Sequence, residues 1–226
     1  MKIGVISDIH GNLPALEAVM EDCGRQNLEK IVCLGDVVGY GASPNECCEL
    51  VREHCAATVM GNHDSALCGI TPMQFFNAYA RAAIEWSQKC IEDSFQQWLG
   101  ELPLTHMEEE VLFVHSTPKD PSAWNYIHNP DEAAQHFAIM PPGRTAFIGH
   151  SHIPAHFAGP EGRRIINIGS VGQPRDRNPH ASYLVYDTET GNFQWSRVSY
   201  DVQKAAQKIR DAGLPEFLAS RLFIGM

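Results

Sequence analysis

Short apolar runs that stop abruptly at a polar residue recur along this chain of 226 residues. Six of them have the length of a strand, and they span Lys2–Ser7, Lys30–Gly35, Ala57–Gly61, Glu110–Val114, Thr145–Gly149 and Arg164–Ile168. Continuous apolar runs of this length are typical of buried strands that are covered on both faces. Because such strands belong mostly to parallel sheets, the pattern predicts an α/β fold.

Helical patterns separate several of these runs. Asn12 is a suitable N-cap and Pro14 fits the first turn of a helix whose apolar positions recur on one face. A second short helix is expected over Pro44–Glu53. One or two further helices, inserted after the third strand, are expected over Met73–Leu99.

The C-terminal part of the chain has a different pattern. Tyr183–Tyr186 and Phe193–Val198 flank a segment that ends at Gly191 and has a turn-forming composition. Two short apolar runs around such a turn predict an antiparallel hairpin. Residues from Val202 onward are expected to form a short amphipathic tail.

Composition narrows the class of protein. The hydrophobic fraction is 44% and the charged fraction 19%, which suits a globular chain with one domain over 1–226 and a helical insert at about 70–100. No apolar run approaches the roughly 18 residues of a membrane span. The N-terminus turns polar after six residues and the seven cysteines form no CxxC pair, so we expect a cytoplasmic protein without a disulfide framework. A formal net charge of −10 argues against a stable complex with nucleic acid.

Side chains that bind metals follow five of the predicted strands. They occur in four strings and one isolated histidine: Asp8-Ile-His10, Gly35-Asp36, Gly61-Asn62-His63-Asp64, Gly149-His150-Ser-His152, and His115. Carboxylate oxygen and imidazole nitrogen are the donors that first-row divalent metals prefer when no thiolate is present. Glycines directly before Asp36, Asn62 and His150 would let the backbone pass close to a crowded pair of metal ions. One such side chain alone is more often a cap or a core residue, but five strand ends together indicate a metal site.

These strings resemble, in their order, the pattern of the calcineurin-like metallophosphoesterases, which is DxH, GD, GNH[DE], a lone His and GHxH. They span Asp8 to His152, and the smaller bacterial and archaeal phosphodiesterase-type members are similar in size and layout. The resemblance implies a β-sandwich of two mixed sheets flanked by helices. It also implies two divalent metal ions, one bound by Asp8, His10, Asp36 and His152, and one by Asp36, Asn62, His115 and His150.

The resemblance further implies hydrolysis of phosphate esters, with a hydroxide between the two ions attacking phosphorus in line. Manganese is the expected metal, with iron, zinc, nickel, cobalt and magnesium as alternatives, because this ligand set accepts several ions. His63 directly follows a ligand and is the candidate catalytic residue, which protonates the leaving alkoxide or stabilises its charge. Asp64 is expected to cap the next helix rather than to orient His63. Asn12, and Arg175 in a Gly-rich GSVGQPR string that similar proteins carry, are candidate contacts for substrate phosphate.

Two positions bear on the substrate. Protein serine/threonine phosphatases carry GDxVDRG, whose second Asp partners the catalytic His and whose Arg binds phosphate, whereas Gly39 and Tyr40 occupy these positions here. Without that Arg a dianionic monoester loses a bidentate partner, which favours phosphodiesters as substrates. The alternatives are a phosphomonoesterase or nucleotide pyrophosphatase, including a protein phosphatase, and a silent scaffold of the same fold, against which the complete ligand set argues. We expect a small phosphate-ester substrate and no membrane partner, and leave a homo-oligomer open.

Overall fold

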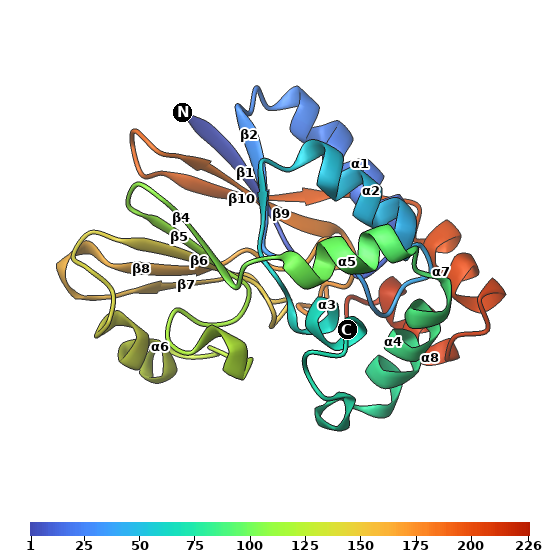
Figure 1. Cartoon of the computed structure of the whole chain (residues 1–226). Coiled ribbons are helices and arrows are strands. Elements are labelled where there is room, and N and C mark those ends of the chain that lie inside the picture. The colour runs from blue at the N-terminus through green and yellow to red at the C-terminus, as the bar shows by residue number, and fades with distance from the viewer.

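Ten strands form two five-stranded sheets in the computed structural model, which describes all residues from Met1 to Met226 (Figure 1). The first sheet has the order β10-β9-β1-β2-β3, and the second has the order β4-β5-β6-β8-β7. The strands are β1 Lys2–Ile6, β2 Lys30–Cys33, β3 Ala57–Thr58, β4 Thr105–Glu108, β5 Val111–Val114, β6 Thr145–Ile148, β7 Ala155–Ala158, β8 Arg164–Asn167, β9 Ala181–Asp187 and β10 Phe193–Val198.

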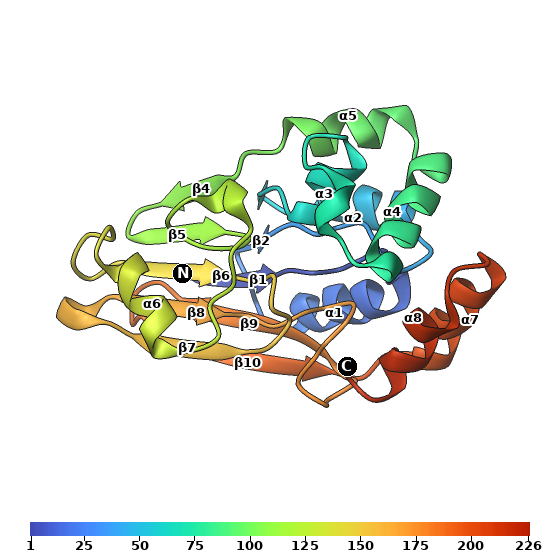
Figure 2. The same cartoon turned by 90° about the horizontal axis from the view of Figure 1, so that it is seen from below.

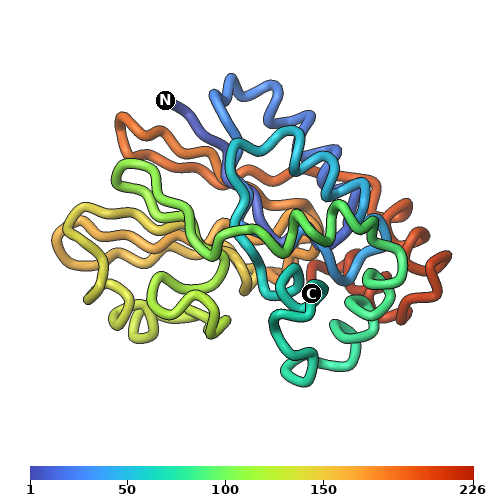
Figure 3. Tube along the Cα trace, viewed as in Figure 1, coloured from blue at the N-terminus to red at the C-terminus, as the bar shows by residue number.

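Both sheets are mixed. In the first sheet β1, β2 and β3 run parallel, while β9 pairs antiparallel with β1 and with β10. In the second sheet β5, β6 and β8 run parallel, and β4 and β7 pair antiparallel at the two edges. Figure 3 shows the C-terminal hairpin, in orange, beside the N-terminal strand, in blue, although the two are far apart in sequence.

The two sheets pack face to face around one apolar cluster. Ile3 and Val5 of β1 face this cluster, which receives Phe113, Phe147 and Ile166 from the second sheet. Because side chains alternate between the faces of a strand, Ile6 of β1 points to the other face of the sheet and packs against residues of α1 (Leu13–Arg25) and α2 (Pro44–His54). Burial of one such side chain contributes about 1.5–3 kcal/mol, so this contact is a main source of the sandwich's stability.

Helices cover the outer faces of the sandwich and gather at one end of it (Figure 2). They are α1 Leu13–Arg25, α2 Pro44–His54, α3 Asn62–Leu67, α4 Ala78–Cys90, α5 Asp93–Glu101, α6 Pro130–Phe137, α7 Val202–Asp211 and α8 Glu216–Ser220, with 3-10 turns η1 Met73–Phe75, η2 Pro121–Ala123, η3 Pro160–Gly162 and η4 Arg221–Phe223. Helices α1 and α2 pack on the first sheet, and α6 packs on the second. None of the helices is long and apolar enough to cross a membrane.

The predicted elements are largely confirmed. Asn12 caps α1 by accepting a hydrogen bond from the N–H of Ala15, and Pro14 lies in the first turn. The stretch Met73–Leu99 contains η1, α4 and most of α5. The third strand is shorter than predicted, because only Ala57–Thr58 pairs before the chain turns into α3. Strands β4 and β7 and helix α6 are not predicted from the pattern.

Candidate metal centre and active site

The polar residues that follow the strands come together at one site. Asp8 and His10 follow β1, Asp36 follows β2, His115 follows β5, and the last two histidines follow β6, so both sheets contribute. The ligand atoms of Asp8, His10, Asp36 and His152 lie within 4.8 Å of one another, and so do those of Asp36, His115 and His150. Asp36 belongs to both groups. The arrangement can therefore hold two ions that share one carboxylate.

The backbone of these loops is unusual. Asp8, His10, Asp36, His150 and His152 all have a positive φ, between 52° and 67°. Such a conformation costs a non-glycine residue about 1–3 kcal/mol and persists only where the surroundings impose it. Hydrogen bonds between the loops impose it here, since the N–H of Asp8 donates to Gly35 at 3.0 Å and the N–H of His10 donates to Asp36 at 2.9 Å. Five of the 12 non-glycine residues with a positive φ therefore belong to this one site.

Each of the four histidine rings is oriented by a backbone carbonyl. Nδ1 donates to Val38 in His10 (3.0 Å), to Leu34 in His115 (2.8 Å) and to Gln173 in His152 (2.6 Å), whereas Nε2 donates to Trp124 in His150 (2.9 Å). In the neutral form of each ring, the second nitrogen is then the unprotonated one and is free to bind a metal. A carbonyl on the other ring nitrogen is the usual way in which a metal-binding histidine is held in place.

The two carboxylates are held in a similar manner. One oxygen of each accepts a backbone N–H: Oδ2 of Asp8 from His150 at 3.0 Å, and Oδ1 of Asp36 from His63 at 2.8 Å. The other oxygen faces the histidines. Oδ2 of Asp36 lies 3.6 Å from Nε2 of His10 and 3.4 Å from Nε2 of His115, which places it between the two groups. Oδ1 of Asn62 lies 3.2 Å from Nε2 of His115 and completes the second group.

The donors fit divalent cations. Oδ1 of Asp8 is buried and accepts no hydrogen bond, and the Nε2 atoms of His10 and His152, both unprotonated in the tautomers above, lie 3.1 Å apart. Lone pairs brought this close in a buried site repel one another unless a cation lies between them. These donor atoms are therefore better suited to binding metal ions than to hydrogen-bonding with one another.

The pKa shifts of the site also favour bound metal ions. Burial lowers the pKa of His10 well below its usual range and that of His150 to about 3, so both rings are in the neutral form that binds metals. Burial also disfavours a charged His115, but Asp36 and Asp8 outweigh it and raise its pKa to about 9. The two carboxylates thus draw positive charge to the centre, and metal ions would supply it.

Two glycines allow this crowding. A Cβ at Gly61 would lie 2.1 Å from Oδ1 of Asp36, and one at Gly149 would lie 2.5 Å from Oδ2 of Asp8. Real Cβ atoms do not approach other atoms this closely. The prediction that glycines beside the ligands allow a close backbone approach is therefore confirmed at both positions.

His63 borders the centre without joining either ligand group. Its ring packs edge-on against His10, with 4.7 Å between centroids, and against Phe76 at 5.2 Å. Its Nδ1 is buried and has no hydrogen-bond partner, and a Cβ at Gly39 would lie 2.3 Å from it. Burial lowers the pKa of His63 to about 4, so the ring is neutral and has one N–H to donate. Gly39 thus provides space beneath the ring in place of a carboxylate partner.

Asp64 caps its helix, as predicted, and also holds the Asp36 loop. Its carboxylate accepts the N–H of Gly61 at 3.1 Å, which is the helix-capping contact. It further accepts the N–H groups of Asp36 at 2.7 Å, Val37 at 3.0 Å and Val38 at 3.2 Å. Burial raises the pKa of Asp64 to about 7, whereas these four donors favour its ionised form. The side chain joins the loops that carry Asp36 and Asn62.

The candidate phosphate contacts are Arg175 and Asn12. Arg175 is half-buried and donates to Oε1 of Gln173 at 2.9 Å and to the hydroxyl of Tyr40 at 3.3 Å. No carboxylate pairs with it, because the neighbouring Asp176 pairs with Arg197. A phosphate contact of Arg175 stays a prediction, and so does that of Asn12. The amide of Asn12 is already engaged in capping α1 and in donating to Gly172 at 2.8 Å.

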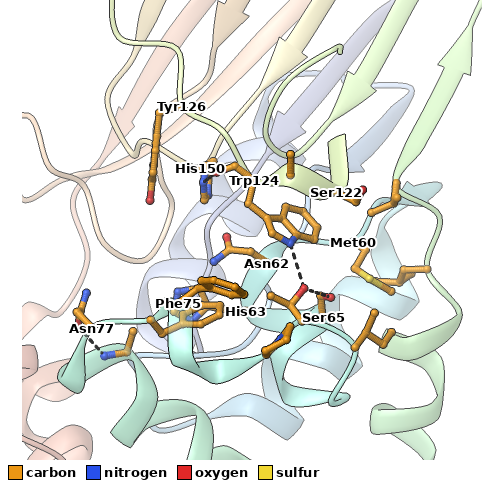
Figure 4. Close-up of a pocket in the computed structure, with 18 of the residues that line it drawn as sticks. Met60, Asn62, His63, Ser65, Phe75, Asn77, Ser122, Trp124, Tyr126 and His150 are labelled. Carbon is orange, nitrogen blue, oxygen red and sulfur yellow. Dashed lines mark hydrogen bonds between the residues drawn. The ribbon is translucent and has the colours of Figure 1, made fainter. Parts of the chain in front are cut away.

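A cleft of about 820 Å³ opens beside the centre (Figure 4). Asn62, His63 and His150 line it, together with apolar residues of η1 and of the segment between η2 and α6. Two aromatic residues in that segment are not predicted from the sequence: Trp124, whose carbonyl holds His150, and Tyr126, whose ring stacks on His150 at 4.1 Å. They belong to no motif, and only the folded chain brings them to the site.

Comparisons with known proteins agree with this geometry. The sequence profile of the calcineurin-like phosphoesterase superfamily domain matches residues 1–191. An uncharacterized protein of Methanocaldococcus jannaschii is 42% identical over 241 residues, which cover 99% of this chain and 98% of that one. Phosphodiesterase YfcE of Escherichia coli is 26% identical over 200 residues, or 84% and 89% of the two chains.

A solved structure agrees over the whole chain. The metallophosphoesterase from Sphaerobacter thermophilus superposes with a TM-score of 0.90 at 37% identity and covers 100% of this chain and 99% of that one. The two mixed sheets, the flanking helices and the aspartate–histidine cluster described above are thus found in a chain whose profile match spans most of its length. The chain belongs to the calcineurin-like phosphoesterase superfamily.

Proposed function

We propose that this chain hydrolyses phosphodiesters at a centre of two divalent ions, with manganese as the expected metal. The observation that supports this most is the position of Asp36, whose Oδ2 lies within 3.6 Å of ring nitrogens from both ligand groups. Two divalent ions, when bound, would polarise the phosphoryl oxygens and make water a better nucleophile. Asp8, His10, Asp36 and His152 would hold one ion, and Asp36, Asn62, His115 and His150 the other.

The chain's own residues have the remaining tasks. His63 is neutral and borders the cleft, and its N–H would donate a hydrogen bond to the leaving oxygen, which stabilises the negative charge that develops there as the phosphorus–oxygen bond breaks. A hydrogen-bond donor of this kind is typically worth about 10²–10³-fold in rate. Asp64 and Gly39 are positioning residues. Asp64 holds the loop of Asp36, and Gly39 leaves space for the ring of His63.

A diester substrate fits this site better than a monoester. A diester carries a single negative charge, and Arg175 is the one guanidinium that donates to Tyr40 at the border of the site. A diester also carries a substituent on each side, and the cleft beside Asn62 and His63 has space for one of them. No carboxylate partners His63 at the position where protein phosphatases carry one, which argues against that branch of the superfamily.

The test is hydrolysis of bis(p-nitrophenyl) phosphate and p-nitrophenyl phosphate in parallel, with metal-stripped protein reloaded with Mn, Ni, Zn or Mg. We expect metal-dependent turnover with the diester as the better substrate. His63→Ala should lower kcat about 10²–10³-fold and keep its metal content. Equal or faster monoester turnover would contradict the diester assignment, and turnover independent of metal would contradict the mechanism.

A further inference from the structure

The cleft beside the metal centre carries no charged side chain. Its 19 lining residues include no Asp, Glu, Lys or Arg, and 11 of them are hydrophobic. Its volume of about 820 Å³ lies in the range of small-molecule sites. A further phosphate placed there would lose its hydration without gaining a cationic partner, which is costly. The cleft thus suits an uncharged part of a substrate.

Aromatic side chains form two walls of this cleft (Figure 4). Phe75 and Phe76 come from η1 and the residue after it, and Trp124 and Tyr126 come from the segment between η2 and α6. Phe75 is 75% exposed and Tyr126 is 46% exposed, although both are large and apolar. An aromatic ring placed between such walls is attracted through its face and edges as well as by burial of its area.

The wall that carries Trp124 is fixed in place. Its indole N–H donates to Oγ1 of Thr71 at 3.0 Å, and Oγ of Ser65 lies 2.7 Å from the same oxygen. Trp124 also has a left-handed backbone, with φ of 53°, and its carbonyl accepts the N–H of the His150 ring. The aromatic wall and a residue of the metal centre are therefore positioned by one segment.

The position of His63 indicates which part of the substrate enters the cleft. His63 lines the cleft, whereas Arg175 does not. If His63 donates to the leaving oxygen, the group attached to that oxygen lies on the same side. The phosphate charge then faces the metal centre and Arg175, and the leaving group faces the aromatic walls.

We propose that this cleft is the leaving-group subsite and that it selects phosphodiesters whose leaving group carries a planar, uncharged aromatic ring. The proposal rests on the proposed function. In the reaction water loses a proton and adds its oxygen to phosphorus, the bond from phosphorus to the leaving oxygen breaks, and the leaving oxygen takes up a proton, so that one water molecule is consumed. Phe75 would be a specificity-determining residue, because its large apolar ring lines the cleft and is 75% exposed.

The test compares two diesters that differ in the shape of the leaving group. Methyl p-nitrophenyl phosphate has a planar aromatic leaving group, and methyl hexafluoroisopropyl phosphate has an activated aliphatic one. We expect Phe75→Ala to raise KM for the aromatic ester about 3- to 10-fold and to change KM for the aliphatic ester less than about 2-fold. Tyr79→Ala is the matched control, since Tyr79 is exposed on the neighbouring α4 but lies outside the cleft.

A second measurement separates this proposal from the proposed function. Saturation-transfer NMR with thymidine on metal-stripped protein should show contacts to the base that are lost in Phe75→Ala and kept in Tyr79→Ala. If no ester is hydrolysed but these contacts are found, the cleft still binds an aromatic ring through Phe75, and it is the proposed function that fails. The subsite is overturned if esters are hydrolysed but Phe75→Ala changes KM equally for both diesters or for neither. It is also overturned if the thymidine contacts do not depend on Phe75.

Discussion

Replacement of Asp64 by asparagine would remove the link between two of the loops that form the metal centre. Oδ2 of Asp64 accepts the N–H groups of Asp36 at 2.7 Å and Gly61 at 3.1 Å, and Oδ1 accepts those of Val37 and Val38. An asparagine amide would place an NH₂ group against one pair of these donors. Two hydrogen bonds to a charged group are then lost, and at roughly 1.5–3 kcal/mol each the cost is about 3–6 kcal/mol.

A loss of this size is a large part of the stability of a typical domain, which is about 5–15 kcal/mol. The measurement is urea unfolding of Asp64→Asn at pH 8 in the presence of a chelator, so that metal binding does not contribute to the free energy of unfolding. Asp201→Asn is the matched control, because Asp201 caps α7 through one contact to Lys204 at 2.8 Å, and asparagine caps a helix about as well as aspartate. We expect the control to change stability by less than about 0.5 kcal/mol.

The metal content of the same variant gives a second result. Because Asp64 positions the backbone of Asp36, Asp64→Asn should bind metal more weakly even where it is folded. A destabilisation below about 1 kcal/mol, together with unchanged metal affinity, would refute the view that Asp64 holds the Asp36 loop.

Two further predictions follow from the same contacts. Gly39→Ala should lower kcat at least about tenfold and keep its metal content. The reason is that the new Cβ would lie 2.3 Å from Nδ1 of His63, at a position where φ is +95°. An unchanged kcat would show that catalysis does not need the ring of His63 in its present position. Metal removal should lower Tm by about 5–10 °C. Metal at 100 times its Kd contributes about 2.7 kcal/mol to stability, and each kcal/mol shifts Tm by about 2–4 °C in a chain of this length. An identical Tm in calorimetric scans with and without chelator would contradict the fit of the donors to metal ions.

Much of the fold follows from local pattern. Buried strands such as β1 and β6 are continuous apolar runs, Asn12 and Pro14 mark the start of α1, and the turn near Gly191 marks the hairpin. The edge strands β4 and β7 are different. They are half-exposed, and histidines and a glutamate interrupt their apolar positions. Their pairing depends on the neighbouring strands, so pattern alone does not indicate them.

The candidate site is likewise predictable from the sequence only in part. Asp8, Asp36 and all of the ligand histidines except His115 lie in short strings whose order along the chain is informative by itself. The motif cannot show that each histidine ring is held by a carbonyl, because the partners come from distant segments, such as Gln173 for His152. The aromatic walls of the cleft are also unmarked, since Phe75 and Trp124 become neighbours of the centre only through the packing of the helical stretch and the segment before α6.

The most direct test of the account is the number of metal ions bound per chain. Elemental analysis of protein reloaded with manganese should give two ions in the wild type. His150→Ala, which removes a ligand of one group only, should keep one, and Asp36→Ala, which removes the shared carboxylate, should keep fewer than one and lose diester turnover. A single ion in the wild type, or two ions in Asp36→Ala, would contradict a centre in which Asp36 joins two metals.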